Sequence, residues 1–270
     1  MKRLNYIVFV AFFLLVAGLF SACDEPVELG KVRGAILPHH LLVEEYIDDF
    51  YKELADDNVE RVILLSPNHF AYGFNHMQTT NQNLGDTSPD LSLIETLADL
   101  GLVAIEPKDF AKEHGVTIHL PYIKEYFPNA GIVPIIFKED VPQEKLDDLI
   151  EALAELENTF VLASIDFTHY AHEDLAMKND REIIDWLDRS EWLKEENLFE
   201  KVNFLAQIFA SGLNGSVGMD SPEAFYVFLE TMRLNGVLEL EVWRRTSSAS
   251  LLELGDPTQN TSHIFVKSRP

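Results

Sequence analysis

The sequence predicts an α/β fold in which a mainly parallel central sheet is flanked by helices, and two observations lead to it. Short apolar runs rich in β-branched residues alternate with segments whose apolar residues recur every three or four positions. No internal repeat or low-complexity linker divides residues 31–270, so we expect a single domain there. Strand, helix and strand in this order form right-handed βαβ units, whose strands run parallel in one sheet.

Four apolar runs predict the strands of this sheet, at residues 32–37, 61–66, 131–137 and 159–166. Between the first two, the segment 42–56 places Phe50 and Leu54 on one face of a helix. Between the last two, Pro142 begins a helix over 142–156, because proline favours the first helical turn. Further helices are expected at 177–193, 198–210 and 221–234, and closing strands at 238–246 and 263–267.

The first 23 residues are typical of a bacterial lipoprotein signal. Two basic residues precede an apolar stretch at 6–20, which is shorter than the ~20 residues that span a bilayer. Small residues then lead to Cys23, the only cysteine of the chain. We expect acylation of Cys23 and a short linker at 24–30, which would anchor the protein to the membrane of the bacterial cell envelope, outside the cytoplasm. A signal-anchor helix is the alternative.

The composition disfavours several partners and chemistries. The formal net charge of −24 at pH 7 becomes more negative once the leader is removed, and this disfavours nucleic acid as a partner. It also disfavours direct adhesion to anionic lipid, so attachment to the membrane depends on the acyl anchor. With Cys23 lipidated, no thiol remains for a disulfide, a zinc–thiolate site or a cysteine nucleophile.

Histidines follow three of the predicted strands. His39 comes after the first, His69 after the second, and His169 shortly after the last. The carboxyl ends of parallel strands meet at the edge where open α/β sheets bind ligands, so we expect these imidazoles to converge. Three imidazoles suit Zn, Cu, Fe or Ni. Two of them with a carboxylate would form a facial Fe(II) site and leave the third as a base, whereas all three with water would form a catalytic zinc site.

A second cluster of polar residues begins at Glu113-His114. We assign Glu113, His114 and His169 as candidate catalytic residues. Asp166 either accepts a hydrogen bond from an imidazole or forms a turn. The helical two-histidine zinc-protease motif, a glycine-rich phosphate loop and a Gly-x-Ser-x-Gly elbow are absent from the sequence, which removes those enzyme classes.

Four motifs in this order resemble the Memo-like family, also called AmmeMemoRadiSam system protein B. They are Ala-Ile-Leu-Pro-His at 35–39, Leu-Ser-Pro-Asn-His at 65–69, Glu-His-Gly-Val-Thr-Ile-His-Leu-Pro-Tyr at 113–122, and Ser-Ile-Asp-Phe-Thr-His-Tyr at 164–170. The resemblance implies a fold similar to the class III extradiol dioxygenases (LigB-like), with a metal-type pocket at the sheet edge. The family's pocket histidines map onto His39, His69 and His169.

The sequence departs from the family pattern at two places. Memo-like proteins often carry Cys-Gly ahead of a proline, where this chain has Asp220 before Ser221-Pro222. Asp220 either replaces the thiolate as a hard metal ligand, which favours Fe(II) or Zn over Cu(I), or caps the helix that begins near Ser221. The family's Pro-His-Ala-Gly is altered at His40 and Leu41, which favours a degenerate pocket.

Three functions remain as expectations. The resemblance implies an exported, lipid-anchored metalloprotein with dioxygenase-like redox chemistry, whose metal is Fe(II), Cu or Zn and whose pocket takes a small molecule or a peptide. The first alternative is a lipoprotein that binds such a ligand in a degenerate pocket without catalysis. The second is a zinc hydrolase.

Overall fold

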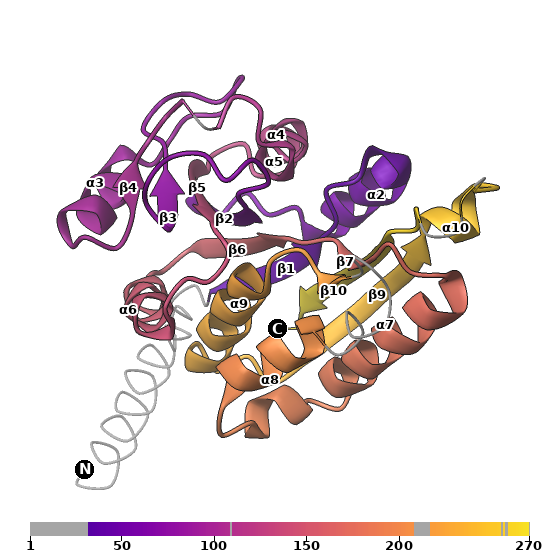
Figure 1. The fold of residues 1–270 in the computed structure, drawn as a ribbon. Coiled ribbons are helices and arrows are strands. Elements are labelled where there is room, and N and C mark those ends of the chain that lie inside the picture. Colours follow the sequence, from indigo (N-terminus) through magenta and orange to yellow (C-terminus); the bar gives the residue numbers. More distant parts are fainter. Residues whose placement is uncertain (1–31, 109, 208–216, 255, 257–258, 270) are drawn as a thin grey trace, which may run out of the picture. The chain divides into compact units, whose positions relative to one another are not determined.

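The apolar runs of the sequence form an eight-stranded central sheet (Figure 1). The structure is a computed structural model that describes residues 32–108, 110–207, 217–254, 256 and 259–269. In spatial order the strands are β4 (Ala104–Ile105), β3 (Met77–Thr79), β5 (Gly131–Phe137), β2 (Arg61–Pro67), β6 (Thr159–Ser164), β1 (Arg33–Leu37), β10 (Ser262–Ser268) and β9 (Leu240–Ser247). Each of the four predicted sheet strands, and both closing strands, is present.

The four central strands of the sheet are parallel, and the strands on either side of them join in the antiparallel direction. Strands β5, β2, β6 and β1 pair in parallel register, with Val62 opposite Phe160 and Ala35 opposite Leu162. On either side of them, β3 and β10 pair in the antiparallel direction. Nearly every residue of the parallel strands is buried, as expected for a sheet that is covered on both faces. The predicted α/β fold with a mainly parallel sheet is therefore confirmed.

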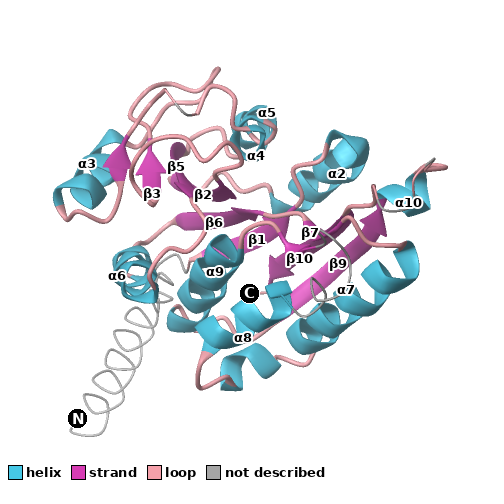
Figure 2. Ribbon diagram, viewed as in Figure 1, coloured by secondary structure: helices cyan, strands magenta, loops and turns pink. Residues whose placement is uncertain are grey.

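Helices cover both faces of the sheet (Figure 2). Along β2, Ile63 and Leu65 join one apolar core, whereas Val62 and Leu64 join the other, because successive side chains of a strand point to opposite faces. The first core is closed by α3 (Leu91–Asp99), α6 (Gln143–Ala154), α7 (Glu173–Asp188), α8 (Leu198–Gln207) and α9 (Pro222–Leu234). The second is closed by α2 (Glu44–Leu54), α4 (His114–Thr117) and α5 (Leu120–Tyr126).

Short elements complete the chain, and one expected helix is divided. The 3-10 helices are η1 (Leu41–Val43) and η2 (Glu191–Lys194), and α10 (Ser248–Leu251) is a single turn. The helix expected at 177–193 begins earlier, as α7, and ends at Asp188. It stops there because Ser190 adopts a left-handed conformation (φ 51°), after which η2 begins.

A second, two-stranded sheet lies beyond the carboxyl end of β6. The strand expected at 159–166 ends at Ser164, and the chain then enters β7 (Phe167–His169), which pairs antiparallel with β8 (Val217–Met219). This pairing brings Asp220 beside Asp166. The backbone N–H of Asp220 donates to the carbonyl oxygen of Asp166 at 3.1 Å, and the N–H of Asp166 donates to Oδ2 of Asp220 at 3.3 Å.

An ionic network around the buried Asp180 attaches β7 to α7 and β9. Arg245 Nε lies 2.8 Å from Oδ2 of Asp180, and its Nη1 lies 2.5 Å from Oε1 of Glu173. The other carboxylate oxygen of Asp180 accepts hydrogen bonds from the hydroxyls of Thr168 and Ser262, both at 2.9 Å. This network therefore fixes the strand that connects Asp166 to His169.

The predicted lipoprotein signal, its cysteine and the linker lie outside the described residues. Within the part of the chain that the structure describes, no helix is both long enough and apolar enough to span a bilayer.

Candidate metal site

His39 occupies the centre of the site, directly beyond the carboxyl end of β1. Its side chain is buried, and Nε2 lies 3.0 Å from Oδ2 of Asp220 and 3.7 Å from Oδ2 of Asp166. On the opposite side of the ring, Nδ1 lies 3.0 Å from the hydroxyl oxygen of Ser164, the last residue of β6. The neighbouring strands β1 and β6 thus place an imidazole between a hydroxyl and two carboxylates.

His69 is oriented by a tight turn after β2 and by Glu113. The side chain of Asn68 exchanges two hydrogen bonds with the backbone of Tyr72, which closes the turn. Glu113 accepts from the backbone N–H of His69 at 3.0 Å, and its Oε1 lies 2.5 Å from Nδ1 of the ring. With Nδ1 held in this way, Nε2 of His69 faces Oδ2 of Asp220 at 3.7 Å.

The close approach of α4 to β2 requires glycine at position 115. Glu113 caps α4 by accepting from the N–H of Gly115 at 3.2 Å. A Cβ on Gly115 would lie 2.3 Å from Oγ of Ser66, a distance that no real contact reaches. Because this approach is possible, the His114 ring lies 3.9 Å from the His69 ring and 5.2 Å from the His39 ring, centroid to centroid.

Two sets of metal-donor atoms meet at His39. The first set consists of His39, His69 and His114, and the second of His39, Asp166 and Asp220. Within each set, the donor atoms, one from each residue, all lie within 4.8 Å of one another. The remaining carboxylate oxygens, Asp166 Oδ1 and Asp220 Oδ1, are buried and make no hydrogen bond within the described residues. Imidazole nitrogens beside carboxylate oxygens suit Fe(II), Zn or Cu(II), so the residues present fit a transition-metal ion.

The imidazoles and carboxylates of the site shift each other's pKa values. Burial lowers the pKa of His39, but the carboxylates of Asp166 and Asp220 outweigh burial and leave that pKa raised. For His69, burial lowers the pKa, but the carboxylates of Asp220 and Glu113, which accept hydrogen bonds from the ring, outweigh burial and raise the pKa to about 9. Burial raises the pKa of Asp220, but His39 and His69 hold it well below its usual range.

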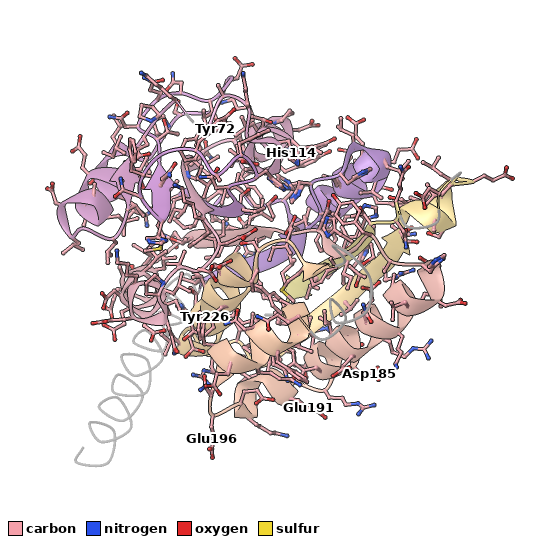
Figure 3. All side chains as sticks on the ribbon, viewed as in Figure 1. Tyr72, His114, Asp185, Glu191, Glu196 and Tyr226 are labelled. Carbon is pink, nitrogen blue, oxygen red and sulfur yellow. The ribbon has the colours of Figure 1, made fainter. Side chains whose placement is uncertain are left out.

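His114 is the most accessible imidazole of the site, with half of its side chain exposed. Burial and the neighbouring His69 and His39 lower the pKa of His114, so it is neutral at physiological pH. Phe70 and Tyr72 stack on each other at 5.3 Å, and Phe70 meets the His114 ring edge-on at 6.2 Å. Figure 3 shows the labelled side chains of Tyr72 and His114 among the loops near α4. Exposed aromatic rings therefore border His114.

His169 lies outside both sets of donor atoms. It ends β7, three residues beyond Asp166, and its ring packs against Tyr170 at 5.8 Å. Its Nδ1 is buried without a hydrogen bond inside the described ranges. It is still near enough to Asp220 to contribute to lowering the pKa of that carboxyl. The predicted convergence therefore brings His39, His69 and Asp220 together, with His114 beside them and His169 farther out.

The helix-cap interpretation of Asp220 is wrong. Ser221 caps α9, because its hydroxyl accepts from the N–H of Ala224 at 3.2 Å. Asp220 is thereby free to face the two imidazoles. His40, in contrast, caps η1 by accepting from the N–H of Leu42, and its ring lies 5.1 Å from that of His263.

Sequence reasoning missed two residues of this region. Ser164 contacts His39, and His119 contacts Ser164 from the far side, with Nε2 3.2 Å from Oγ. Ser164 stands at the carboxyl end of a predicted parallel strand, and this position could have indicated that it lies at the site. His119 stands in the motif at 113–122, but local pattern does not indicate what its side chain contacts, since it lies at the junction of two short helices.

Comparisons with known proteins identify the family of the chain. The family model described as "Memo-like protein" matches residues 16–251. A MEMO1 family protein of Methanothermobacter thermautotrophicus is 29% identical over 168 residues, which are 57% of this chain and 60% of that protein. MEMO1 family proteins of Nitrosopumilus maritimus and Methanopyrus kandleri are 29% and 30% identical, each over half of this chain and 52% of theirs. The matched regions thus span only 52 to 60% of the length of these relatives.

Proposed function

Because the chain belongs to the Memo-like protein family, we propose that it is a metalloprotein holding one transition-metal ion between His39, His69 and Asp220. One observation carries the proposal: Nε2 of both imidazoles faces the same carboxylate oxygen of Asp220, at 3.0 Å from His39 and 3.7 Å from His69. Two histidines and one carboxylate are the ligands of non-haem Fe(II) proteins, which leave metal positions open for reactants. Fe(II) is therefore the preferred ion, with Zn and Cu as alternatives.

We further propose redox chemistry of the dioxygenase type on a hydroxylated aromatic molecule. The bound metal would supply the activation of O2 and of the substrate. His114, neutral and half exposed, would take a proton from a substrate hydroxyl, while Phe70 and Tyr72 would pack against the aromatic ring. Glu113 would hold His69 in position, and His169 is a second candidate base.

Metal analysis tests this proposal. Protein purified after growth with excess iron and zinc is expected to hold about one transition-metal ion per chain, and His69→Ala is expected to lose it. His172→Ala is the matched control, because His172 is exposed and precedes α7, on an element that contributes no donor atom. A wild-type protein without metal would contradict the proposal, as would equal metal content in His69→Ala.

We propose that the mature protein is exported and anchored to the membrane of the bacterial cell envelope through an acylated Cys23. The proposal is supported by the leader, the small residues before Cys23 and the absence of any second cysteine. Labelling with a fatty-acid analogue should mark the wild-type chain and leave Cys23→Ser unmarked. Equal labelling of both, or of neither, would contradict it.

Two other functions are each favoured by one observation. The replaced family cysteine and the altered glycine favour a lipoprotein that binds a small molecule or peptide without catalysis. Ligand-dependent thermal stabilisation that survives a chelator would support this function. The group of His39, His69 and His114 favours a zinc hydrolase, because three imidazoles and a water form a catalytic zinc sphere. Ester hydrolysis that depends on zinc would support the hydrolase.

A further inference from the structure

A chain of three buried hydrogen bonds leads away from His39 into the second core. Nδ1 of His39 contacts the Ser164 hydroxyl at 3.0 Å, this hydroxyl contacts Nε2 of His119 at 3.2 Å, and Nδ1 of His119 contacts the Tyr51 hydroxyl at 3.0 Å. Tyr51, Ser164 and His119 are 0% exposed, and His39 is 4% exposed. Tyr51 comes from α2, Ser164 from β6, and His119 from the junction of α4 and α5.

We infer that Ser164 and His119 are positioning residues, which fix the ring proton of His39 on Nδ1 and so present the lone pair of Nε2 to the metal. The inference rests on the proposed metal site and extends it to residues that supply no donor atom. Hydrogen bonds to the non-coordinating nitrogen of a metal-bound histidine generally fix its tautomer and its orientation. In this protein, the Ser164 hydroxyl is the hydrogen-bond partner of the non-coordinating nitrogen of His39, and the same hydroxyl contacts Nε2 of His119.

The direction of the hydrogen bonds follows from counting protons. When Nε2 of His39 binds a metal, Nδ1 must carry the ring proton and donates it to the Ser164 oxygen. Within the described residues, the Ser164 hydroxyl then has one neighbour with a free lone pair, Nε2 of His119. His119 must accept there, so its own proton lies on Nδ1 and is donated to the oxygen of Tyr51. The other tautomer of His119 would leave the Ser164 proton unpaired beside the metal ligand, whereas this one places the unpaired proton on the Tyr51 hydroxyl at the far end of the chain.

His119 is suited to this role because it stays neutral. It is fully buried, and burial together with the nearby His39 lowers its pKa to about 3. A neutral imidazole always has one nitrogen that accepts and one that donates, whereas an imidazolium has none that accepts. At physiological pH, His119 can therefore accept the proton of Ser164.

The tautomer of His119 in the zinc-loaded, full-length protein is the direct test. Zn²⁺ is diamagnetic, so long-range proton–nitrogen spectra of ¹⁵N-histidine-labelled protein can report which ring nitrogen carries the proton. We expect Nδ1–H for both His39 and His119 with Zn²⁺. Nε2–H of His119 in the zinc-loaded protein would overturn the inference. A protein that takes up no Zn²⁺ would overturn the metal site and, with it, this extension.

Variants of Ser164 provide a second test. Ser164→Ala removes the hydroxyl and should weaken Zn²⁺ binding by about 10- to 100-fold, the usual effect of removing a group that orients a metal ligand. Ser164→Thr keeps the hydroxyl and should restore most of the affinity. Thr231→Val is the matched control, because its buried hydroxyl makes no hydrogen bond among the described residues. A folded Ser164→Ala with wild-type affinity would overturn the inference. Restored affinity in Ser164→Thr shows that the loss in Ser164→Ala comes from the missing hydroxyl, because threonine would not relieve a packing defect.

Discussion

Replacing Arg245 with methionine should destabilise the fold by leaving a buried carboxylate without its cation. The Asp180 side chain is 1% exposed and that of Arg245 is 17% exposed, so little water screens the pair. Removing one partner of a buried ion pair costs about 3–5 kcal/mol. Asp180 keeps hydrogen bonds from Thr168 and Ser262, so we expect a loss near the lower end, about 3 kcal/mol at pH 7.

The cost should shrink in acid. Burial already raises the pKa of Asp180 even though Arg245 opposes it, and the variant loses that opposition. As the pH falls through the raised pKa, Asp180 takes up a proton and its unpaired charge disappears. The difference in unfolding free energy between the wild type and Arg245→Met should therefore be larger at pH 7 than at pH 5.

Urea unfolding at the two pH values measures this difference. Arg269→Met is the control, because Arg269 is about half exposed and pairs with Glu239 and Glu241 at the surface. Its replacement should cost much less stability than that of Arg245. Adding Asp180→Asn to Arg245→Met should recover part of the loss. A loss below about 1 kcal/mol for Arg245→Met, or a double variant no more stable than the single one, would show that the buried charge of Asp180 does not depend on Arg245.

Three further predictions concern the site and its surroundings. Burial lowers the pKa of His263 to about 4. Between pH 6.5 and that value, His263 is protonated in the unfolded chain but neutral in the folded one, so the free energy of unfolding falls by up to about 1.4 kcal/mol per pH unit. Between pH 6.5 and 4.5, the unfolding free energy of His263→Leu should fall less steeply with decreasing pH than that of the wild type. Equal dependence on pH in the two proteins would contradict this. The added methyl group of Gly115→Ala would clash with Ser66 and should displace His69. Metal affinity measured by titration should then fall about tenfold or more, and an unchanged affinity would count against the geometry of the site. Asp220→Cys should shift metal competition from Fe(II) toward Zn and Cu(I), because a thiolate is a softer ligand, and an unchanged preference would argue that position 220 is no ligand.

The sequence could predict the parts of the fold that depend on local pattern. The strands that carry Ile63 and Val161 are continuous apolar runs, and the helix containing Phe50 repeats its apolar residues with the helical period. The edge where His39 and His69 meet follows from parallel strands alone. These predictions needed no knowledge of contacts between distant segments.

The rest depends on contacts that local pattern does not encode. Asp220 reaches His39 only because β8 pairs with β7, two three-residue strands too short to give a periodic signal. The same small sheet carries His169 beyond the donor atoms, because each strand residue advances the chain by about 3.3 Å. His119 and Tyr51 meet through packing of helices 68 residues apart.

Anomalous diffraction from crystals of the metal-loaded protein would locate the metal relative to His39, His69 and Asp220. We expect one strong anomalous peak within coordination distance of Nε2 of His39, Nε2 of His69 and a carboxylate oxygen of Asp220. A peak elsewhere on the molecule, or none at this point in crystals grown with excess Fe(II) or Zn²⁺, would contradict it.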